Sequence, residues 1–386
     1  MANAFTNLIP SIYEALDVVS RELVGFIPAV NKDTAIDRAA LGETVYFHVA
    51  APIAATDIAP AKYIPDPSDL NEGSDSMQLT KARSASFYVT GEEAKGLDNG
   101  AKWSSVFKGK IQQAFRTLTN EMEQALAGLL IYASRAYAVT SGNIFDATDS
   151  IGSIAQVRRI LSDNGANLSD LHLVLDTNFA AKLRSMAVLY KANEAGTDQM
   201  LRDGILGRLH GMAVHESGGI APVTIYSGTP SGLVIDGTGN IAKGSTSLKL
   251  KTGSGAFRKG DVVTIGADTS QRYVVAADGT ATALSINGPG IVAAVADGNA
   301  VAKIGALTAY TPLAAFGRNA LTLATRVPAL PPDGDAGEHI VAQDPVSGIA
   351  FDIARYRQYR REVFEVSIVY GVKCTKSEHL ALIMGS

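Results

Sequence analysis

The chain has 386 residues, of which 46% are hydrophobic and 19% are charged, and its formal net charge is −4. This composition excludes a disordered chain, the length allows two or three domains, and the slightly negative charge argues against a protein whose main role is to coat nucleic acid. The single cysteine, Cys374, excludes an intrachain disulfide and is expected to be a buried thiol.

The N-terminal region, residues 1–43, begins with the pattern of an amphipathic helix. Apolar residues recur three or four positions apart over residues 7–27, which predicts a helix, and Gly25 and Pro28 are its stop signals. The N-terminus lacks the basic and apolar regions of a signal peptide. No apolar run reaches the roughly 20 residues of a membrane span. We therefore expect a soluble, unexported protein with no membrane partner.

Residues 44–90 contain two strand-like runs, TVYFHV (44–49) and SASFYVT (84–90), with 34 residues between them. A structureless connection of this length is unusual inside a compact domain. We therefore expect a long two-stranded finger with an acidic tip. The carboxylates of the finger are Asp66, Asp69, Glu72 and Asp75.

Residues 91–150 contain the longest helical pattern, in which apolar side chains follow one face over residues 101–137. At 1.5 Å per residue such a helix is roughly 50 Å long. A helix of this length is typical of a mechanical spine.

Residues 151–221 alternate between helix and strand, which predicts an α/β unit. A helix is expected to stop at Asn164-Gly165, a buried strand occupies residues 171–176, and Asp176 or Thr177 is expected to cap a helix over 177–186.

Residues 222–305 show six short strand-like runs divided by glycine- and aspartate-containing turns, among them residues 291–296. This pattern predicts a small inserted β-barrel or sandwich. The α/β unit resumes over residues 306–386, with a half-buried strand at 363–372.

Motifs for catalysis or metal binding are not evident in the sequence. GNIAKGS (239–245) departs from the phosphate-loop order. His210 and His215 lack the spacing of metal ligands and are interpreted as chance polar positions. Asp333, Asp335 and Glu338 lack the rest of a calcium loop and are interpreted as a solvated acidic loop. We expect no catalytic residue, no metal site and no cofactor.

The segment ARYRQYRR (354–361) interleaves arginine with tyrosine, a pattern that also suits nucleic-acid binding. Acidic neighbours, Asp352, Glu362 and Glu365, partly offset its charge. Ion pairs within the chain or to a neighbouring subunit are the favoured interpretation, and direct nucleic-acid contact is the alternative.

The order of these parts resembles the major capsid protein of tailed bacteriophages, the Hong Kong 97-type fold. Its parts are an N-arm (1–43), an E-loop (44–90), a P-domain with a spine helix (91–150), and an A-domain together with returning P-domain strands (151–221 and 306–386). Within that fold the chain is most similar to coat proteins of short-tailed Salmonella phages, which carry an inserted β-domain (here 222–305). Three stretches carry this similarity: LRDGILGRLHGMAVHES (201–217), FRKGDVVTIG (257–266) and VYGVKCTKSEHLAL (369–382). This chain has Ser377 where the family has proline.

The resemblance implies a non-enzymatic shell protein. Its hexamers and pentamers would enclose phage double-stranded DNA, which would touch the shell only through non-specific lumen contacts. It also implies a separate scaffolding protein, a portal protein and a possible decoration protein as partners. The expected location is the virion, after assembly in the host cytoplasm.

The E-loop would contact a neighbouring subunit, so the finger carboxylates are expected to meet basic residues there. The candidates are Arg355, Arg357, Arg360 and Arg361, then Lys81, Arg83, Lys108 and Arg116.

Three alternatives remain: an encapsulin-type compartment shell, another phage structural protein of the tail or decoration kind, and an unrecognised α/β enzyme. The inserted β-domain and the C-terminal motif favour the phage capsid over the first. The spine helix and finger argue against the second, and the lack of a convergent set of catalytic residues argues against the third.

Overall fold

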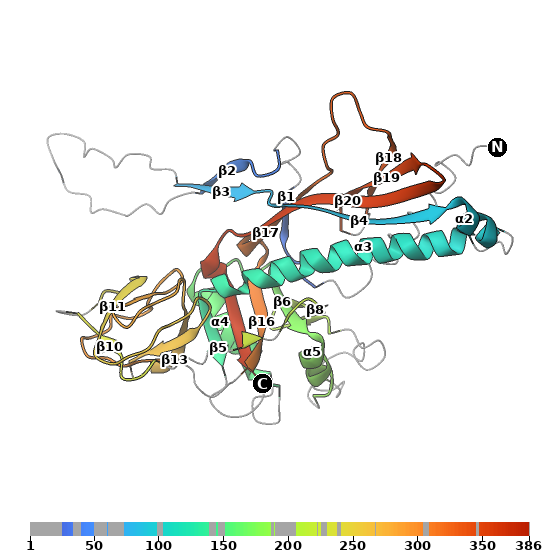
Figure 1. The fold of residues 1–386 in the computed structure, drawn as a ribbon. Helices are drawn as coiled ribbons and strands as arrows, with labels where there is room; N and C mark the ends of the chain where they lie inside the picture. The colour runs from blue at the N-terminus through green and yellow to red at the C-terminus, as the bar shows by residue number, and fades with distance from the viewer. Residues whose placement is uncertain are drawn as a thin grey trace.

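The computed structural model describes residues 25–33, 40–49, 60, 73–98, 103–138, 144–145, 151–186, 189, 206–221, 223–224, 230–237, 241–266, 268–303, 309–344 and 347–385. They form a mixed α+β molecule that is extended rather than round (Figure 1). The predicted N-terminal helix lies almost wholly outside these residues. No helix in the described ranges is long and apolar enough to cross a membrane.

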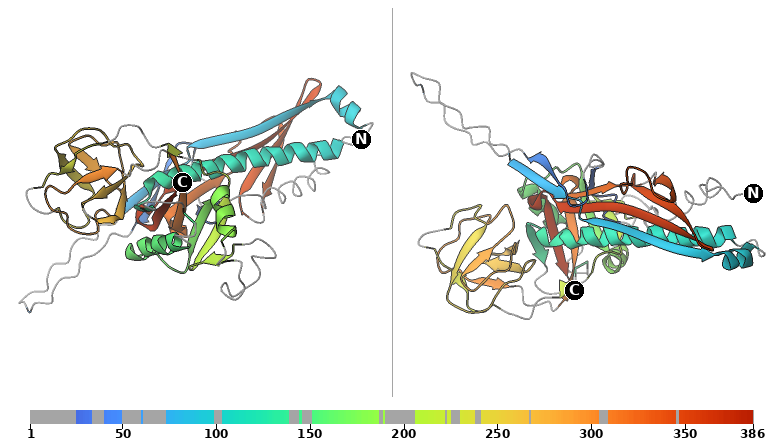
Figure 2. Two further views of the ribbon diagram at one scale, coloured as in Figure 1. Left: turned by 90° about the horizontal axis from the view of Figure 1, so that it is seen from below. Right: turned by 45° about the horizontal axis from the view of Figure 1, so that its top comes forward.

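One end of the molecule is a six-stranded sheet packed on a long helix (Figure 2). Helix α3 (Trp103–Ala127) runs beside the sheet and places Phe107 and Phe115 against it. Phe107 lies edge-on to Phe364, with ring centroids 4.8 Å apart. The strands are β1 (Asn31–Asp33), β4 (Lys81–Thr90), β17 (Leu321–Arg326), β18 (Gly337–Gln343), β19 (Ala350–Gln358) and β20 (Arg361–Cys374). The short helix α2 (Gly91–Asp98) follows β4 at the far end.

A ten-stranded sheet forms the second body, and α4 (Gly152–Asp163) and α5 (Thr177–Arg184) pack beside it. Its centre is apolar because β6 (Leu171–Asp176) is buried along nearly its whole length. Strand β6 runs parallel to β8 (Met212–Ser217) and antiparallel to β16 (Ala309–Gly317). The other strands on this side are β5 (Arg135–Ala138), β7 (Arg208–Leu209), β9 (Val223–Thr224) and β21 (Leu380–Gly385).

Residues 230–303 are β-rich and bury a hydrophobic cluster of their own, which runs from Leu233 to Val301. The strands are β10 (Val234–Ile235), β11 (Ser247–Lys251), β12 (Val262–Ile265), β13 (Asp268–Val274), β14 (Ala283–Ser285) and β15 (Val301–Lys303). Strand β13 pairs with β5, so β12, β13 and β15 extend the ten-stranded sheet. The strand predicted at 291–296 is wrong, because this stretch makes only an isolated bridge between Ile241 and Val295.

The pairing predicted for the finger is also wrong. Strand β2 (Thr44–Val49) pairs with β3 (Gly73–Gln78), and not with the run at 84–90. That run belongs to β4, which pairs with β20 along ten residues, from Lys81↔Tyr370 to Thr90↔Arg361. Within residues 44–90, β2 and β3 therefore form a separate two-stranded sheet, here called the finger base, and β4 is part of the main sheet.

The long helix ends earlier than the predicted residue 137. It stops at Ala127, continues as a 3-10 turn over Gly128–Tyr132, and gives way to β5 at Arg135. Glycine weakens a helix interior, and Gly128 stands where the regular helix ends. Residues 135–138 consequently belong to the ten-stranded sheet and not to the spine-helix unit.

Candidate functional site

The arginine-rich segment forms the last part of β19 and the turn into β20. Arg355 is only 6% exposed, and its guanidinium binds Glu362 with Nη2–Oε1 and Nη2–Oε2 distances of 2.7 and 2.8 Å. Arg357 reaches Glu338 on β18, with Nη2 2.8 Å from Oε1. These two arginines therefore make ion pairs within their own chain, across neighbouring antiparallel strands.

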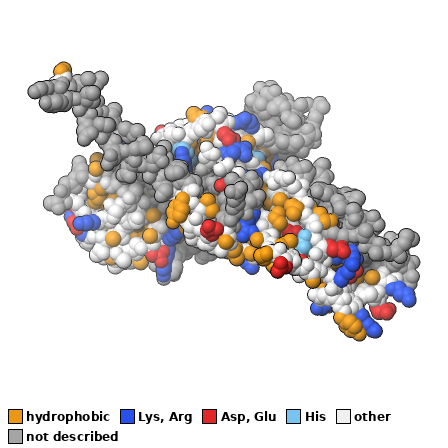
Figure 3. Space-filling model, turned by 90° about the horizontal axis from the view of Figure 1, so that it is seen from above, with side chains coloured by type: hydrophobic (Ala, Val, Ile, Leu, Met, Phe, Trp, Pro, Cys, Tyr) orange, Lys and Arg blue, Asp and Glu red, His pale blue; other side chains and the backbone are white. Residues whose placement is uncertain are grey.

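The other two arginines lie at the exposed tip of the turn. Arg360 has a positive φ of 59°, a backbone conformation that costs a non-glycine residue free energy. Its guanidinium lies 5.4 Å from the ring centroid of Tyr359, which is 87% exposed, and that of Arg361 lies 5.5 Å from the centroid of Tyr88. Figure 3 shows basic beside apolar side chains at this end of the molecule. Exposed tyrosine and arginine are the residue types enriched where interfaces hold most of their binding energy.

Of the predicted finger carboxylates, Asp75 is described by the structure, and Asp66, Asp69 and Glu72 lie outside the described residues. Asp75 stands at the base of the finger in β3 and forms an ion pair with Lys373 of β20 in the same chain. It is therefore already engaged within its own chain.

Lys81 and Arg83 lie on β4, where both meet Glu121 of α3. The Arg83 Nε donates to Glu121 Oε1 at 2.7 Å, Lys81 Nζ lies 3.6 Å from the same oxygen, and the Tyr370 hydroxyl donates to it at 3.0 Å. Although burial opposes the shift, the hydrogen bonds from Arg83 and Tyr370 lower the pKa of Glu121. This cluster ties the strand that follows the finger to the long helix.

Lys108 and Arg116 lie on α3, both partly exposed. The Arg116 Nη1 donates to Gln113 Oε1 at 3.1 Å, one turn earlier on the helix. The structure thus does not bring the eight basic candidates into one patch. Arg355, Arg357, Arg360 and Arg361 share the β19–β20 hairpin, Lys81 and Arg83 share β4, and Lys108 and Arg116 lie on the helix.

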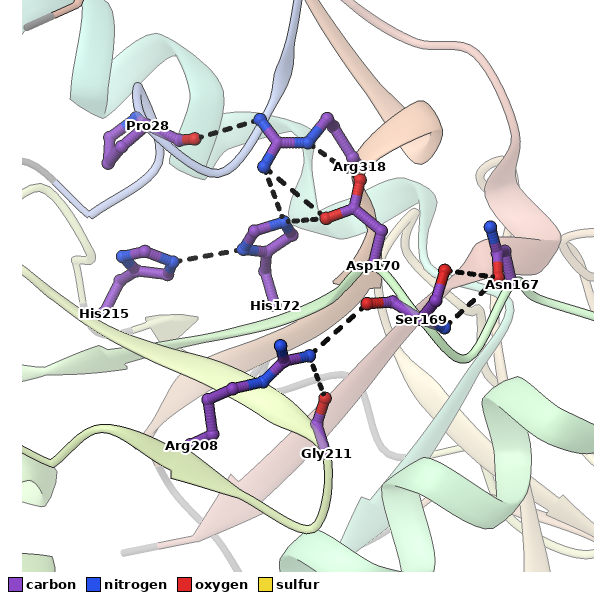
Figure 4. Close-up of polar contacts among 9 residues, drawn as sticks. All are labelled: Pro28, Asn167, Ser169, Asp170, His172, Arg208, Gly211, His215 and Arg318. Carbon is purple, nitrogen blue, oxygen red and sulfur yellow. Dashed lines mark hydrogen bonds and ion pairs between the residues drawn. The ribbon is translucent and has the colours of Figure 1, made fainter.

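The sequence analysis missed a histidine cluster on the ten-stranded sheet (Figure 4). His172 Nδ1 and His215 Nε2 are 3.1 Å apart, on the parallel strands β6 and β8. His172 Nε2 lies 2.9 Å from Asp170 Oδ1, and Arg318 Nε donates to Asp170 Oδ2 at 2.8 Å. Burial, with the neighbouring His172 and Arg318 charges, lowers the pKa of His215 to about 4. His215 is consequently part of a neutral pair at pH 7, and not a chance polar position.

A buried carboxylate was also missed. Glu123 of α3 is 1% exposed and accepts hydrogen bonds from the backbone N–H groups of Phe26 and Ile27 and from the Ser217 hydroxyl. Burial raises the pKa of this carboxyl, and the hydrogen bonds from Ser217, Ile27 and Phe26 act against that rise. A glutamate on the apolar side of the helix was the only sequence signal.

Asp333, Asp335 and Glu338 are exposed, as predicted for a solvated acidic loop, and Asp335 also bonds within the chain. His339 Nε2 lies 2.8 Å from Asp335 Oδ1, and His339 Nδ1 lies 3.0 Å from Asp352 Oδ2. Burial acts against protonation, but the two carboxylates raise the pKa of His339 overall. His339 lies between two carboxylates and links the end of the loop to β19.

Among the residues that the structure describes, no group of three or more His, Cys, Asp or Glu side chains is arranged to bind a metal ion. Cys374 at the end of β20 is partly buried, and this burial raises the pKa of its thiol to about 12, which makes it a poor nucleophile. The arrangement offers charged and aromatic surface for contact.

Comparison by sequence finds no matching family model and no matching curated protein. Comparison by structure finds a capsid structure of the cyanophage P-SCSP1u, with a TM-score of 0.49 and 8% identity over 94% of this chain and 88% of that chain. The capsid of a native GTA particle gives a TM-score of 0.48 and 10% identity over 95% and 91%. A virus-like particle from Pyrococcus furiosus gives 0.43 and 8% over 99% and 100%. With identities and TM-scores this low, the likeness by itself assigns neither a fold family nor a function.

Proposed function

We propose that this chain is a shell-forming major capsid protein of a tailed bacteriophage, with the Hong Kong 97-type arrangement. The observation that carries the proposal is the order and layout of its parts. A two-stranded finger base (β2–β3) leads into β4, which lies along the 25-residue helix α3, and a separate α/β body follows. The sequence resemblance supports the same assignment.

The extended shape supports assembly rather than action as a single subunit. Strand β2 exposes Tyr46, which is 71% accessible in the isolated chain. This ring offers contact area to a partner, because tyrosine is enriched among the residues that hold most of the binding energy of interfaces. A neighbouring copy of the chain is the partner that a closed shell supplies.

The finer parts of the proposal extend the resemblance. Copies would form hexamers and pentamers around double-stranded DNA, with a separate scaffolding protein and a portal, and β10–β15 would be the inserted domain. The finger carboxylates Asp66 and Asp69 would meet the hairpin tip of a neighbour. Arg360 and Arg361 are the first candidates there, because Arg355 and Arg357 already pair within the chain.

A charge-swap experiment tests this contact. We expect Arg360→Glu with Arg361→Glu to block assembly, and Asp66→Lys with Asp69→Lys to do the same. Combining all four changes in one chain should restore shells, because each repelling pair becomes attractive again. Lys249→Glu is the matched control, since Lys249 is an exposed lysine on β11. Failure of the combined variant, while each pair alone blocks assembly, would contradict this pairing.

The encapsulin-type shell is the second candidate function, since it shares the resemblance to the fold. The two differ in contents: the phage proposal requires packaged DNA, and the compartment requires a protein cargo. Nuclease-protected DNA in native particles would support the phage capsid. A protein that co-purifies inside the particles, without DNA, would support the encapsulin-type compartment.

A further inference from the structure

Residues 25–30, here called the junction segment, connect the N-terminal residues to β1. The segment is buried at Phe26, Ile27 and Val30, and Phe26 stacks on Phe316 of the ten-stranded sheet with ring centroids 6.1 Å apart. Gly25 is packed so closely that an added Cβ would lie 2.8 Å from the Ser217 Cβ. Two polar side chains from different parts of the fold hold this segment: Glu123, which titrates, and Arg318, which lies beside titratable histidines.

Glu123 is the first group. Its Oε1 accepts from Ile27 N at 2.8 Å and Phe26 N at 3.0 Å, and its Oε2 accepts from Ser217 Oγ at 2.7 Å. The Ser217 oxygen in turn accepts from Gly219 N at 3.2 Å, so its hydroxyl hydrogen is free to point at Glu123. All the recorded partners of the carboxylate, among the described residues, are uncharged donors.

Protonation of Glu123 therefore breaks the match between donors and acceptor. A protonated carboxyl carries an O–H that must itself find an acceptor, and it accepts more weakly than a carboxylate. The buried N–H groups of Phe26 and Ile27 would lose their charge-assisted bonds, and a buried donor left without a strong partner is costly. Burial raises the pKa of Glu123, which moves this event toward mildly acidic conditions.

Arg318 is the second group, and the histidine pair controls it. Arg318 Nη1 donates to the Pro28 carbonyl at 3.3 Å, while its Nε and Nη2 face Asp170 and its Nη2 also lies 3.2 Å from His172 Nε2 (Figure 4). Arg208 contributes a further positive charge felt by His172. The facing charged or titratable groups are thus Asp170, His172, His215, Arg208 and Arg318.

With both histidines neutral, one hydrogen suffices for the 3.1 Å contact between their ring nitrogens. Protonation of both places two N–H groups against each other and adds two positive charges beside Arg318, with Asp170 as the single carboxylate of the cluster. Like charges at this distance repel. This repulsion destabilises the position of Arg318, and with it the hydrogen bond that Arg318 donates to the Pro28 carbonyl.

We infer that the junction segment is a proton-operated clasp: it is closed on α3 and the ten-stranded sheet at neutral pH, and acidification releases it through Glu123 and the His172–His215 pair together. Both protonation events loosen neighbouring residues of one segment, Phe26 to Pro28. Release would allow the chain that precedes the junction segment to leave the body in a different direction. The clasp lies within one chain and does not depend on the proposed shell.

Hydrogen exchange followed by mass spectrometry on the full chain tests the clasp, with labelling times scaled to the intrinsic exchange rate at each pH. Between about pH 7.5 and about pH 3.5, which lies below the pKa of about 4 of His215, peptides covering the junction segment should lose at least about tenfold more protection than peptides of β17. Glu123→Gln should show the loss already at neutral pH, because the amide replaces an acceptor with a donor. The double variant His172→Gln, His215→Gln should retain more protection than the wild type at the acidic pH.

His379→Gln is the matched control, since burial also lowers the pKa of His379, whose ring lies beside Glu378. It should leave the response unchanged. Protection of β17 in every variant reports whether the fold is intact. Equal loss in the junction segment and β17 of the wild type, or full protection of the segment in Glu123→Gln at neutral pH, would overturn the clasp.

Discussion

Arg355 on β19 and Glu362 on β20 are diagonal neighbours across the two strands, and the guanidinium binds the carboxylate with a Nη2–Oε1 distance of 2.7 Å and a Nε–Oε2 distance of 3.2 Å. Arg355 is buried, and its guanidinium also lies 6.0 Å from the ring centroid of Phe364. The ion pair therefore stabilises the packed part of the β19–β20 hairpin, whereas Arg360 and Arg361 lie at its exposed tip. One short basic segment thus divides into a structural half and an exposed half.

This division predicts different consequences for stability. Arg355→Met should lower the free energy of unfolding by about 1–3 kcal/mol, because it removes charge-assisted hydrogen bonds from a buried site. Arg361→Met should change it by less than about 0.5 kcal/mol, because that side chain is exposed. Chemical denaturation monitored by circular dichroism measures both. Equal effects of the two substitutions would contradict the division.

The cluster around Glu121 predicts a loss of stability in acid. The folded-state pKa of Glu121 is lowered, so its contribution is present above about pH 4.5 and is lost as the pH falls through the folded pKa. Glu121→Gln should lower stability at pH 7 by about 0.5–2 kcal/mol, since each partly exposed pair is worth about 0.2–1 kcal/mol. The melting temperature of this variant should also fall less steeply than that of the wild type as the pH drops below about 4.5. A variant that keeps the wild-type slope below pH 4.5 would show that Glu121 does not produce it.

His339 predicts the opposite pH dependence. Its pKa is raised by Asp335 and Asp352, so its contribution is complete below about pH 6.5 and is lost as the pH rises through the folded pKa. His339→Gln should therefore lower the melting temperature more at about pH 6 than at about pH 8.5. His379→Gln should not show this trend, because the pKa of His379 is shifted down. A uniform loss at both pH values for His339→Gln would argue against an imidazolium between two carboxylates.

Two glycines predict opposite effects of the same substitution. An added Cβ at Gly371 in β20 would lie 2.2 Å from the backbone oxygen of Gln78, at the base of the finger, whereas Gly109 on α3 has no atom within 4 Å of such a Cβ. Gly371→Ala should destabilise by about 1–3 kcal/mol or more through overpacking. Gly109→Ala should stabilise by about 0.5–1 kcal/mol, because alanine is the better helix former. Thermal unfolding of the two variants checks the signs.

Local signals in the sequence predicted several elements closely. Asp176 ends the buried strand β6 and caps α5 by accepting from Asn178 N at 3.2 Å, and both elements were predicted at this boundary. Asn164 and Gly165, the latter with a φ of 77°, end α4 as their chemistry requires. These features depend on residues that are close together in the sequence, so they can be predicted from the sequence alone.

Features set by distant contacts were not predictable in the same way. Strand β3 reads GSDSMQ, which has no apolar alternation, and it becomes a strand because β2 pairs with it. His172 and His215 are 43 positions apart and meet only because β6 and β8 run parallel. The role of Glu123 depends on a chain segment 97 positions earlier. Pairing between distant strands therefore determines both the finger and the clasp.

The central claim is that this chain assembles into a closed shell, and electron microscopy of the purified protein, with its mass from light scattering, tests it most directly. The account predicts closed particles, or rings of five or six subunits that close when a scaffolding protein is added. A uniform monomer or dimer of about 40 or 80 kDa, unchanged on concentration and on mixing with a scaffolding protein, would contradict it.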